Sequence, residues 1–119
     1  MNPQRRPCKE IVEKVLKRVH YVTIRGRLDA ETAPQLDAVL DAAMGRGHFR
    51  IILDISEVPY ISSRGLKSMI RARKLTRRFN RGDLRLVHPQ PKIREVLEFT
   101  GLLPLFPIYD DPVEAVGSF

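Results

Sequence analysis

Two adjacent serines, Ser62 and Ser63, are the residues of this chain best placed to do chemistry. They follow an apolar run that ends in Asp54, and they stand just before Gly65 and a segment with helical spacing. A serine at the start of a helix can accept a hydrogen bond from a backbone amide as an N-cap. It can also carry a phosphoryl group, because free amides and the helix dipole favour an anion there. The spacing leaves open whether the pair only caps the helix or also acts as a phosphorylated switch.

The segment that these serines open is strongly basic. Of the 21 lysines and arginines in the chain, eight lie between residues 64 and 81, where there is no acidic residue. The formal net charge of +7 therefore comes almost entirely from this segment. Steps of three and four residues place five of these side chains on one face of a helix: Arg64, Lys67, Arg71, Lys74 and Arg78. This stripe is either a solvated face or a contact surface for an acidic protein or an anionic membrane. Nucleic acid is disfavoured, because no aromatic residues alternate with the charges.

Other common chemistries find no support in the sequence. The three histidines are far apart and lack the spacing of metal ligands. The chain has no glycine-rich phosphate loop and no G-x-S-x-G elbow. We therefore expect no catalytic residues, no metal and no cofactor, and a protein that is not an enzyme.

Size and composition indicate one globular domain. The chain has 119 residues, of which 43% are hydrophobic, enough for a continuous core. We expect an amino-terminal tail over residues 1–9 and a single domain over 10–119. The single cysteine, Cys8, excludes an internal disulfide and is typical of a reducing compartment. No signal peptide and no apolar run of about 18 residues is present, so a cytoplasmic location is predicted.

Strand-like segments recur along the chain. Residues 19–25 (VHYVTIR) are rich in β-branched and aromatic side chains and predict a strand. The preceding residues 11–19 fit a helix or a strand, and no Asn-Gly turn marks a hairpin. A continuous apolar run over 49–53 is typical of a strand covered on both faces. Further strands are predicted over 84–87 and over 105–109, the latter at a sheet edge because of Pro104 and Pro107.

Helical segments alternate with these strands. The first helix should begin after Thr32, which with Gln35 forms a T-x-x-Q capping box, and end at Gly45 or Gly47. The second is expected over residues 64–79, and its core anchors are Leu66, Met69, Ile70 and Phe79. The third should begin at Pro91 and stop at Gly101, and the fourth should follow an Asp111 cap. Helices thus flank a mostly parallel sheet, and right-handed crossovers should gather Asp29, Asp54, Ser62 and Ser63 at one edge.

Three ordered motifs resemble those of the STAS domain family (sulfate transporter and anti-sigma factor antagonist). G-R-L-D-A-E-T-A at residues 26–33 resembles the family's G-x-L-D-x-x-T. D-I-S-E-V-P-Y-I-S-S-R-G-L at 54–66 resembles D-x-S-x-V-x-Y/F-x-x-S-x-G-L, and L-E-F-T-G-L at 97–102 resembles the carboxyl-terminal pattern. The resemblance implies an α/β fold with a small, mixed, mostly parallel sheet of four to five strands flanked by four helices.

The resemblance also implies a non-enzymatic role as a stand-alone anti-sigma factor antagonist. Such antagonists bind an anti-sigma factor, often an ATP-dependent serine kinase, and are phosphorylated by it. A phosphatase then resets the switch. Alignment on Gly65 makes Ser63 the phosphoacceptor, with Ser62 as the alternative. The partner-binding residues that the resemblance implies are Asp29, Thr32, Asp54, Ser56, Ser62, Arg64, Gly65 and Lys67.

A second function is compatible with the same family. The chain could be an accessory or regulatory subunit of a membrane transport complex, with no phosphorylation cycle. In that case the basic stripe would rest on an acidic cytoplasmic loop or on anionic lipid.

Overall fold

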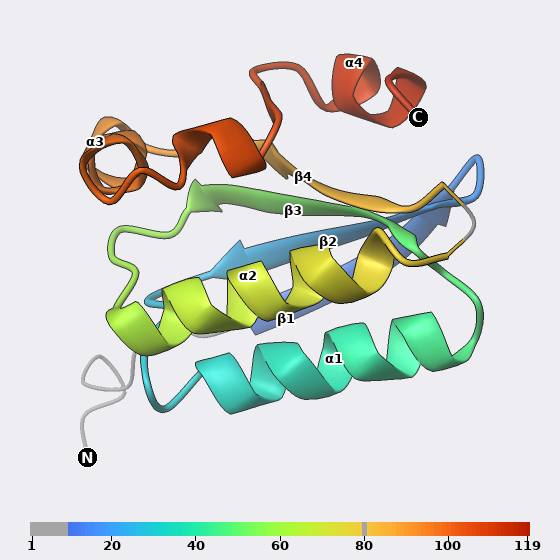
Figure 1. The fold of residues 1–119 in the computed structure, drawn as a ribbon, viewed down its shortest axis with the longest axis horizontal. Helices are drawn as coiled ribbons and strands as arrows, with labels where there is room; N and C mark the ends of the chain where they lie inside the picture. Colours follow the sequence, from blue (N-terminus) through green and yellow to red (C-terminus); the bar gives the residue numbers. More distant parts are fainter. Residues whose placement is uncertain (1–9, 80) are drawn as a thin grey trace.

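The computed structural model describes residues 10–79 and 81–119, so Cys8 and the expected tail lie outside the described residues. Within these ranges the chain forms one sheet with helices on both faces (Figure 1). Its strands lie side by side in chain order: β1 (Glu10–Leu16), β2 (Val19–Arg25), β3 (Arg50–Glu57), β4 (Asp83–Val87) and β5 (Ile108–Tyr109). Strand β1 is antiparallel to β2, and the other neighbours are parallel. The predicted mixed, mostly parallel sheet is confirmed.

Helices cover the two faces of the sheet unequally. Figure 1 shows α1 (Ala33–Gly45) and α2 (Ser63–Thr76) side by side on one face, and α4 (Pro112–Gly117) on the other. Helix α3 (Pro91–Phe99) lies at the end of the sheet toward which β2 and β3 point. Both α1 and α2 begin at that same end. Within residues 10–79 and 81–119, no helix has the length and apolar character needed to cross a membrane.

The side chains of β3 point alternately to the two faces of the sheet and so contribute to two layers of the core. Ile51, Leu53 and Ile55 are fully buried in the large layer under α1 and α2. Ile52 points the other way and packs in a smaller cluster with Ala115 of α4. Successive side chains of a strand point to opposite faces, so Asp54 lies on the face of Ile52. A register irregularity between β2 and β3 follows before Glu57.

The ambiguous segment before β2 is a strand. Its register pairs Leu16 with Val19, which leaves Lys17 and Arg18 as a two-residue hairpin turn. Both turn residues have positive φ, 50° and 70°, as a type I′ turn requires. Lysine and arginine adopt this conformation at a cost. The sequence therefore lacks the Asn-Gly signal that would have identified the hairpin.

Replacing the turn with Asn-Gly should stabilise the protein. The double variant Lys17→Asn/Arg18→Gly is expected to raise the free energy of unfolding by about 1 kcal/mol, because these residues adopt positive φ with less strain. Urea unfolding followed by circular dichroism measures the change. Lys17→Ala/Arg18→Ala removes the same charges but leaves the strain of positive φ in place, so it should not raise the free energy of unfolding. Equal stabilisation by both double variants would contradict a backbone origin.

The predicted capping box at the start of α1 is wrong. The helix begins after Thr32 as expected, but the Thr32 side chain makes no cap hydrogen bond. Instead its hydroxyl accepts from the amide of Asp29 at 2.9 Å and donates to the carbonyl oxygen of Arg27 at 2.7 Å. The side chain thus closes the loop that leads into the helix, and it is not available to cap the helix.

The predicted end of the second helix is also wrong. Helix α2 ends at Thr76, because the chain leaves the helix at Arg77 and enters β4 at Asp83. This places Phe79 at the surface, 54% exposed, with its ring packed on Phe49 at 5.1 Å between centroids. Of the other expected anchors, Met69 is buried, while Leu66 and Ile70 are only partly buried.

Two strand boundaries differ from the prediction. Strand β3 continues four residues beyond the apolar run, to Glu57. The expected strand over 105–109 is instead a 3-10 helix, Leu103–Leu105, followed by the two residues of β5. Proline lacks an amide donor, so Pro104 and Pro107 shorten the strand and keep it at the edge. The edge position is confirmed.

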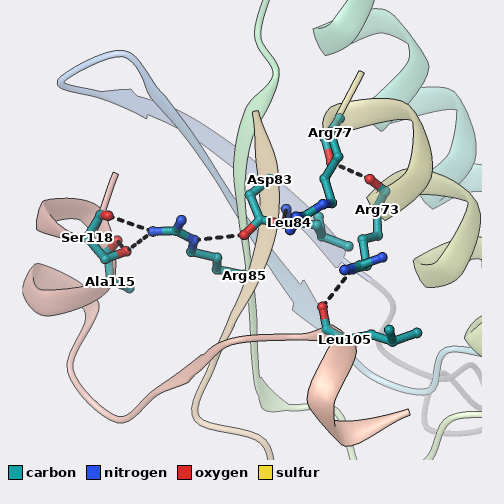
Figure 2. Close-up of polar contacts among 9 residues, drawn as sticks. Arg73, Arg77, Asp83, Leu84, Arg85, Leu105, Ala115 and Ser118 are labelled. Carbon is teal, nitrogen blue, oxygen red and sulfur yellow. Dashed lines mark hydrogen bonds and ion pairs between the residues drawn. The ribbon is translucent and has the colours of Figure 1, made fainter. Parts of the chain in front are cut away.

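A buried carboxylate, Asp83, joins α2 and α4 through β4 (Figure 2). Its Oδ1 accepts from Arg77 at 3.2 Å and from the Leu84 amide at 2.9 Å, and its Oδ2 accepts from Arg85 at 3.1 Å. Arg85 also donates to the carbonyl oxygen of Ser118 at 2.7 Å, just after α4. These contacts hold the ends of two helices against the start of β4.

Candidate functional site

The two serines at the start of α2 have different roles. Ser62 has an extended backbone, with φ −84° and ψ 172°, and its Oγ accepts from the amide of Gly65 at 3.2 Å. Ser62 is therefore the N-cap, and it satisfies one of the free amides of the first turn. Ser63 is the first residue of the helix and is exposed. Capping by Ser62 leaves the hydroxyl of Ser63 open to solvent at the positive end of the helix dipole.

Backbone pairing brings the loop after β2 beside these serines. The amide of Gly26 donates to Glu57, and the amide of Leu28 donates to Tyr60, both at 3.0 Å. The amide of Ser62 then donates to the carbonyl oxygen of Leu28 at 2.9 Å. These bonds extend the β2–β3 pairing past the ends of both strands. Asp29 is the residue after Leu28, so this bond places Asp29 close to Ser62, the N-cap of α2.

Gly65 allows this close approach. A β-carbon at residue 65 would lie 2.7 Å from the carbonyl oxygen of Leu28 and 2.9 Å from its Cγ. It would also lie 3.0 Å from Ile61. Only a residue without a side chain fits here unless the backbone moves.

Asp29 and Thr32 form a compact hydrogen-bonded loop next to the serines. Asp29 Oδ1 accepts from the amides of Glu31 at 3.0 Å and Thr32 at 3.2 Å. Burial alone would raise the pKa of Asp29, but these hydrogen bonds and the nearby Arg27 hold it below its usual value. The carboxylate is thus a fixed negative charge at neutral pH. Because a lowered pKa favours the folded state, its contribution to stability is lost as the pH falls through the folded-state pKa.

Arg27 and Tyr60 complete the rim of the site. The Arg27 guanidinium lies over the Tyr60 ring, 5.2 Å from its centroid, and its Nε is 3.7 Å from Asp29. Tyr60 is 47% exposed in the loop before Ser62. Sequence reasoning did not single out either residue. An exposed aromatic residue in a loop between two matched motifs was a usable signal for Tyr60.

The two basic residues closest to Ser63 differ in availability. Arg64 donates to Asp37 of α1 at 2.9 Å and to Ser68 at 2.7 Å. Its guanidinium is therefore held along the helix, one turn away from the amino terminus. Lys67 is exposed and has no hydrogen bond or ion pair within the part of the chain described. Lys67, four residues after Ser63, is the cation free to approach a phosphate there.

Asp54 and Ser56 do not join the serines. Asp54 and Ser56 lie two and four residues after Ile52, on the face of the sheet that carries α4. Asp54 accepts from the Tyr21 hydroxyl at 2.6 Å and from the Ser56 hydroxyl at 2.8 Å. Burial and this bond raise the pKa of Tyr21 above its usual value. The expectation that Asp54 gathers with Ser62 and Ser63 is wrong, because the predicted strand ended too early to reveal its face.

Asp54 and Ser56 instead line a second hollow. An open groove of about 760 Å³ lies beside α4 on the sheet face of β1, β2 and β3. Tyr21 and Lys14 lie along it from the strands, and Val113 from α4. Alternation of apolar and polar residues from Leu53 to Ser56 was the sequence signal that would have separated this groove from the serines.

Comparison with known proteins links the chain to one family. The STAS domain family matches residues 10–115. BtrV of Bordetella bronchiseptica, described as an anti-sigma factor antagonist, is 34% identical over 96 residues, which cover 81% of this chain and 82% of that protein. A structure from Thermotoga maritima with the same description has a TM-score of 0.80 at 28% identity, covering 91% and 92% of the two chains. SpoIIAA of Bacillus in its phosphorylated form shares the fold, with a TM-score of 0.73 at 22% identity, covering 92% and 98%.

Proposed function

Because this chain belongs to the STAS domain family, we propose that it is an anti-sigma factor antagonist whose binding is switched by phosphorylation of Ser63. The observation that supports a phosphorylation switch is that the two serines at the start of α2 have different roles. Ser62 caps the helix, and the exposed hydroxyl of Ser63 makes no hydrogen bond to any residue that the structure describes. The anti-sigma factor would be a serine kinase, and a phosphatase would reverse the modification. The protein itself would act without catalysis.

A phosphate on Ser63 would change the surface without disturbing the fold. It adds about −1.5 to −2 charges at neutral pH. The free amides and dipole of α2 stabilise such a charge, and Lys67 lies on the same face one turn on. The domain should therefore stay folded after modification. A partner that contacts Ser63 would have to bury the new charge, and it would bind less tightly.

The partner surface would surround Ser63. We propose contacts at Asp29, Thr32, Ser62, Gly65 and Lys67, which lie in the paired loops and the first turns of α2. The hydrogen bonds that hold Asp29 and Thr32 in one conformation support this role, since a rigid loop loses little entropy on binding. Roles for Asp54, Ser56 and Arg64 stay predictions, and so does the cytoplasmic location.

The decisive variant is Ser63→Glu. We expect it to bind the unphosphorylated anti-sigma kinase at least tenfold more weakly than the wild type, because the carboxylate imitates part of the phosphate charge. Ser63→Ala should bind as tightly as the wild type and take up no phosphate. Isothermal titration calorimetry measures the affinities. Incubation with the kinase and ATP, followed by mass spectrometry, locates the modified residue.

Two controls separate charge from size and capping. Ser63→Gln has the shape of the glutamate variant without its charge and should bind within about twofold of the wild type. Ser62→Ala removes the cap and should cost about 1 kcal/mol of stability while leaving phosphorylation of Ser63 intact. The switch is refuted if Ser63→Glu binds as tightly as Ser63→Gln, or if the phosphate is found on Ser62.

The accessory role in a membrane transport complex makes the opposite prediction. In that role the basic residues of α2 would carry the interaction, and Ser63→Glu would have no effect on binding. The same titration, with the transporter's cytoplasmic segment in place of the kinase, therefore distinguishes the two functions.

A further inference from the structure

A basic groove lies between α1 and α2 and begins at Arg64, directly after Ser63. Its volume is about 720 Å³. Basic side chains of α2 form one wall, Asp37 of α1 lies on the other, and Ile70 and Leu75 are its apolar lining residues. These two are partly buried against the core and so form a recessed floor. Figure 1 shows the two helices side by side, and the α2 residues that line the groove run from Arg64 to Leu75, so the groove follows the helix.

The charges that border the groove are only partly neutralised. Arg64 pairs with Asp37 at 2.9 Å, and Arg71 pairs with Asp41 at 3.0 Å. Three cations of the stripe have no acidic partner among residues 10–79 and 81–119: Lys67, Lys74 and Arg78. The groove therefore has an excess of positive charge above an apolar floor.

The free cations have a helical spacing of their own. Lys67 and Lys74 are seven residues apart in α2, about 10.5 Å along the helix axis. Arg78 follows four residues later, in the turn after the helix. A second helix laid along the groove would present acidic residues at positions i and i+7 with the same separation. Its apolar residues at i+3 and i+4 would then face Ile70 and Leu75.

We infer that the groove between α1 and α2 binds an acidic amphipathic helix of another protein. Charge complementarity and the recessed apolar floor favour this occupant over an anionic membrane. Membrane-binding helices present apolar side chains outward, whereas no large hydrophobic residue of α2 is exposed. Arg64 and Arg71 are already paired with aspartates of α1. This breaks up the row of unpaired cations that would neutralise the phosphates of a nucleic acid. The inference does not depend on phosphorylation of Ser63, which directly precedes Arg64 at the start of the groove but is not one of its lining residues.

The test uses a designed helical peptide of about 18 residues, about 27 Å long, with glutamates at i and i+7 and leucines at i+3 and i+4. Fluorescence anisotropy should show binding to the full-length protein that weakens as salt is raised. The double variant Lys67→Glu/Lys74→Glu should weaken binding at least tenfold. A peptide with glutamine in place of the two glutamates should bind the wild-type protein more weakly by a similar factor.

The matched control changes the same charge elsewhere. Lys92 and Arg94 are exposed on α3 and have no ion pair within the described chain, so Lys92→Glu/Arg94→Glu should bind the peptide as the wild type does. Equal losses in both double variants would indicate unspecific attraction and overturn the inference. So would failure of the peptide to bind. Two further assays are sedimentation with phosphatidylserine vesicles and binding to a DNA duplex. The inference is also overturned if Lys67→Glu/Lys74→Glu weakens either of these interactions by a larger factor than it weakens peptide binding.

Discussion

Replacing Gly65 with alanine is expected to lower the free energy of unfolding by about 2 kcal/mol and to weaken binding to the anti-sigma factor. The added methyl group would lie 2.7 Å from a backbone oxygen of Leu28. Overpacking of this kind costs about 1–3 kcal/mol, and the upper end is expected here because the clash is with backbone. Subtracting the gain of about 1 kcal/mol in helix propensity leaves a net loss of about 2 kcal/mol. Relief requires the loop that holds Asp29 to move away from Ser62. The variant should therefore lose both stability and the alignment of the proposed partner surface.

The same substitution at Gly45 is the matched control. Gly45 is also in a helix, but a β-carbon there meets no atom within 4 Å. Gly45→Ala should raise the free energy of unfolding by about 0.5–1 kcal/mol and leave binding unchanged. Urea unfolding and calorimetric titration of both variants measure the two effects. If Gly65→Ala were as stable as Gly45→Ala, the tight packing of α2 against Leu28 would be refuted.

Removing the carboxylate of Asp83 should have the largest effect on stability, about 3 kcal/mol. Loss of one partner from a buried ion pair costs about 3–5 kcal/mol. The cost should fall at the lower end, because the Arg77 side chain is 51% exposed and can turn to water. Arg85, only 20% exposed, cannot do so as readily, and the Leu84 amide loses its acceptor (Figure 2). Urea unfolding of Asp83→Ala measures the loss.

Two further variants define the origin of that loss. Asp83→Asn keeps an acceptor for Leu84 but removes the charge, so its destabilisation should be intermediate. Asp110→Ala removes an exposed carboxylate with no partner in the described chain and should change stability by less than about 0.5 kcal/mol. A loss at Asp83 no greater than at Asp110 would contradict the proposed linkage of α2, β4 and α4.

The parts of the fold that sequence reasoning predicted are those with strong local signals. Apolar spacing located α1, Pro91 and Gly101 located α3, and a cap located α4, where Asp111 accepts from the amide of Val113. Alternation of strands and helices indicated the parallel sheet, and three ordered motifs indicated the family. The serine pair was placed at the start of α2, but only the backbone geometry distinguished Ser62 as the cap from Ser63 as the exposed residue.

The parts that it missed depend on contacts between distant segments. The hairpin turn uses positive φ at lysine and arginine, which no propensity favours. Thr32 bonds backward to Arg27 instead of capping, because the preceding loop leaves an acceptor within its reach. Asp54 was expected at the sheet edge beside the serines, but polar residues continue β3 beyond its apolar run. Pairing of Asp54 with β2 and β4, and of Glu57 with β2, keeps this stretch in the sheet.

The parallel strands separate the two regions where we expect the largest effects. Gly65 follows the end of β3, whereas Asp83 opens β4, so they lie at opposite ends of the sheet. An eight-residue strand such as β3 spans roughly 25 Å at about 3.3 Å per residue. Substitutions so far apart usually have additive effects. A sequence change that alters partner choice at the serine end, at some cost in stability, can therefore be compensated at the Asp83 end, and the two ends can evolve as separate modules.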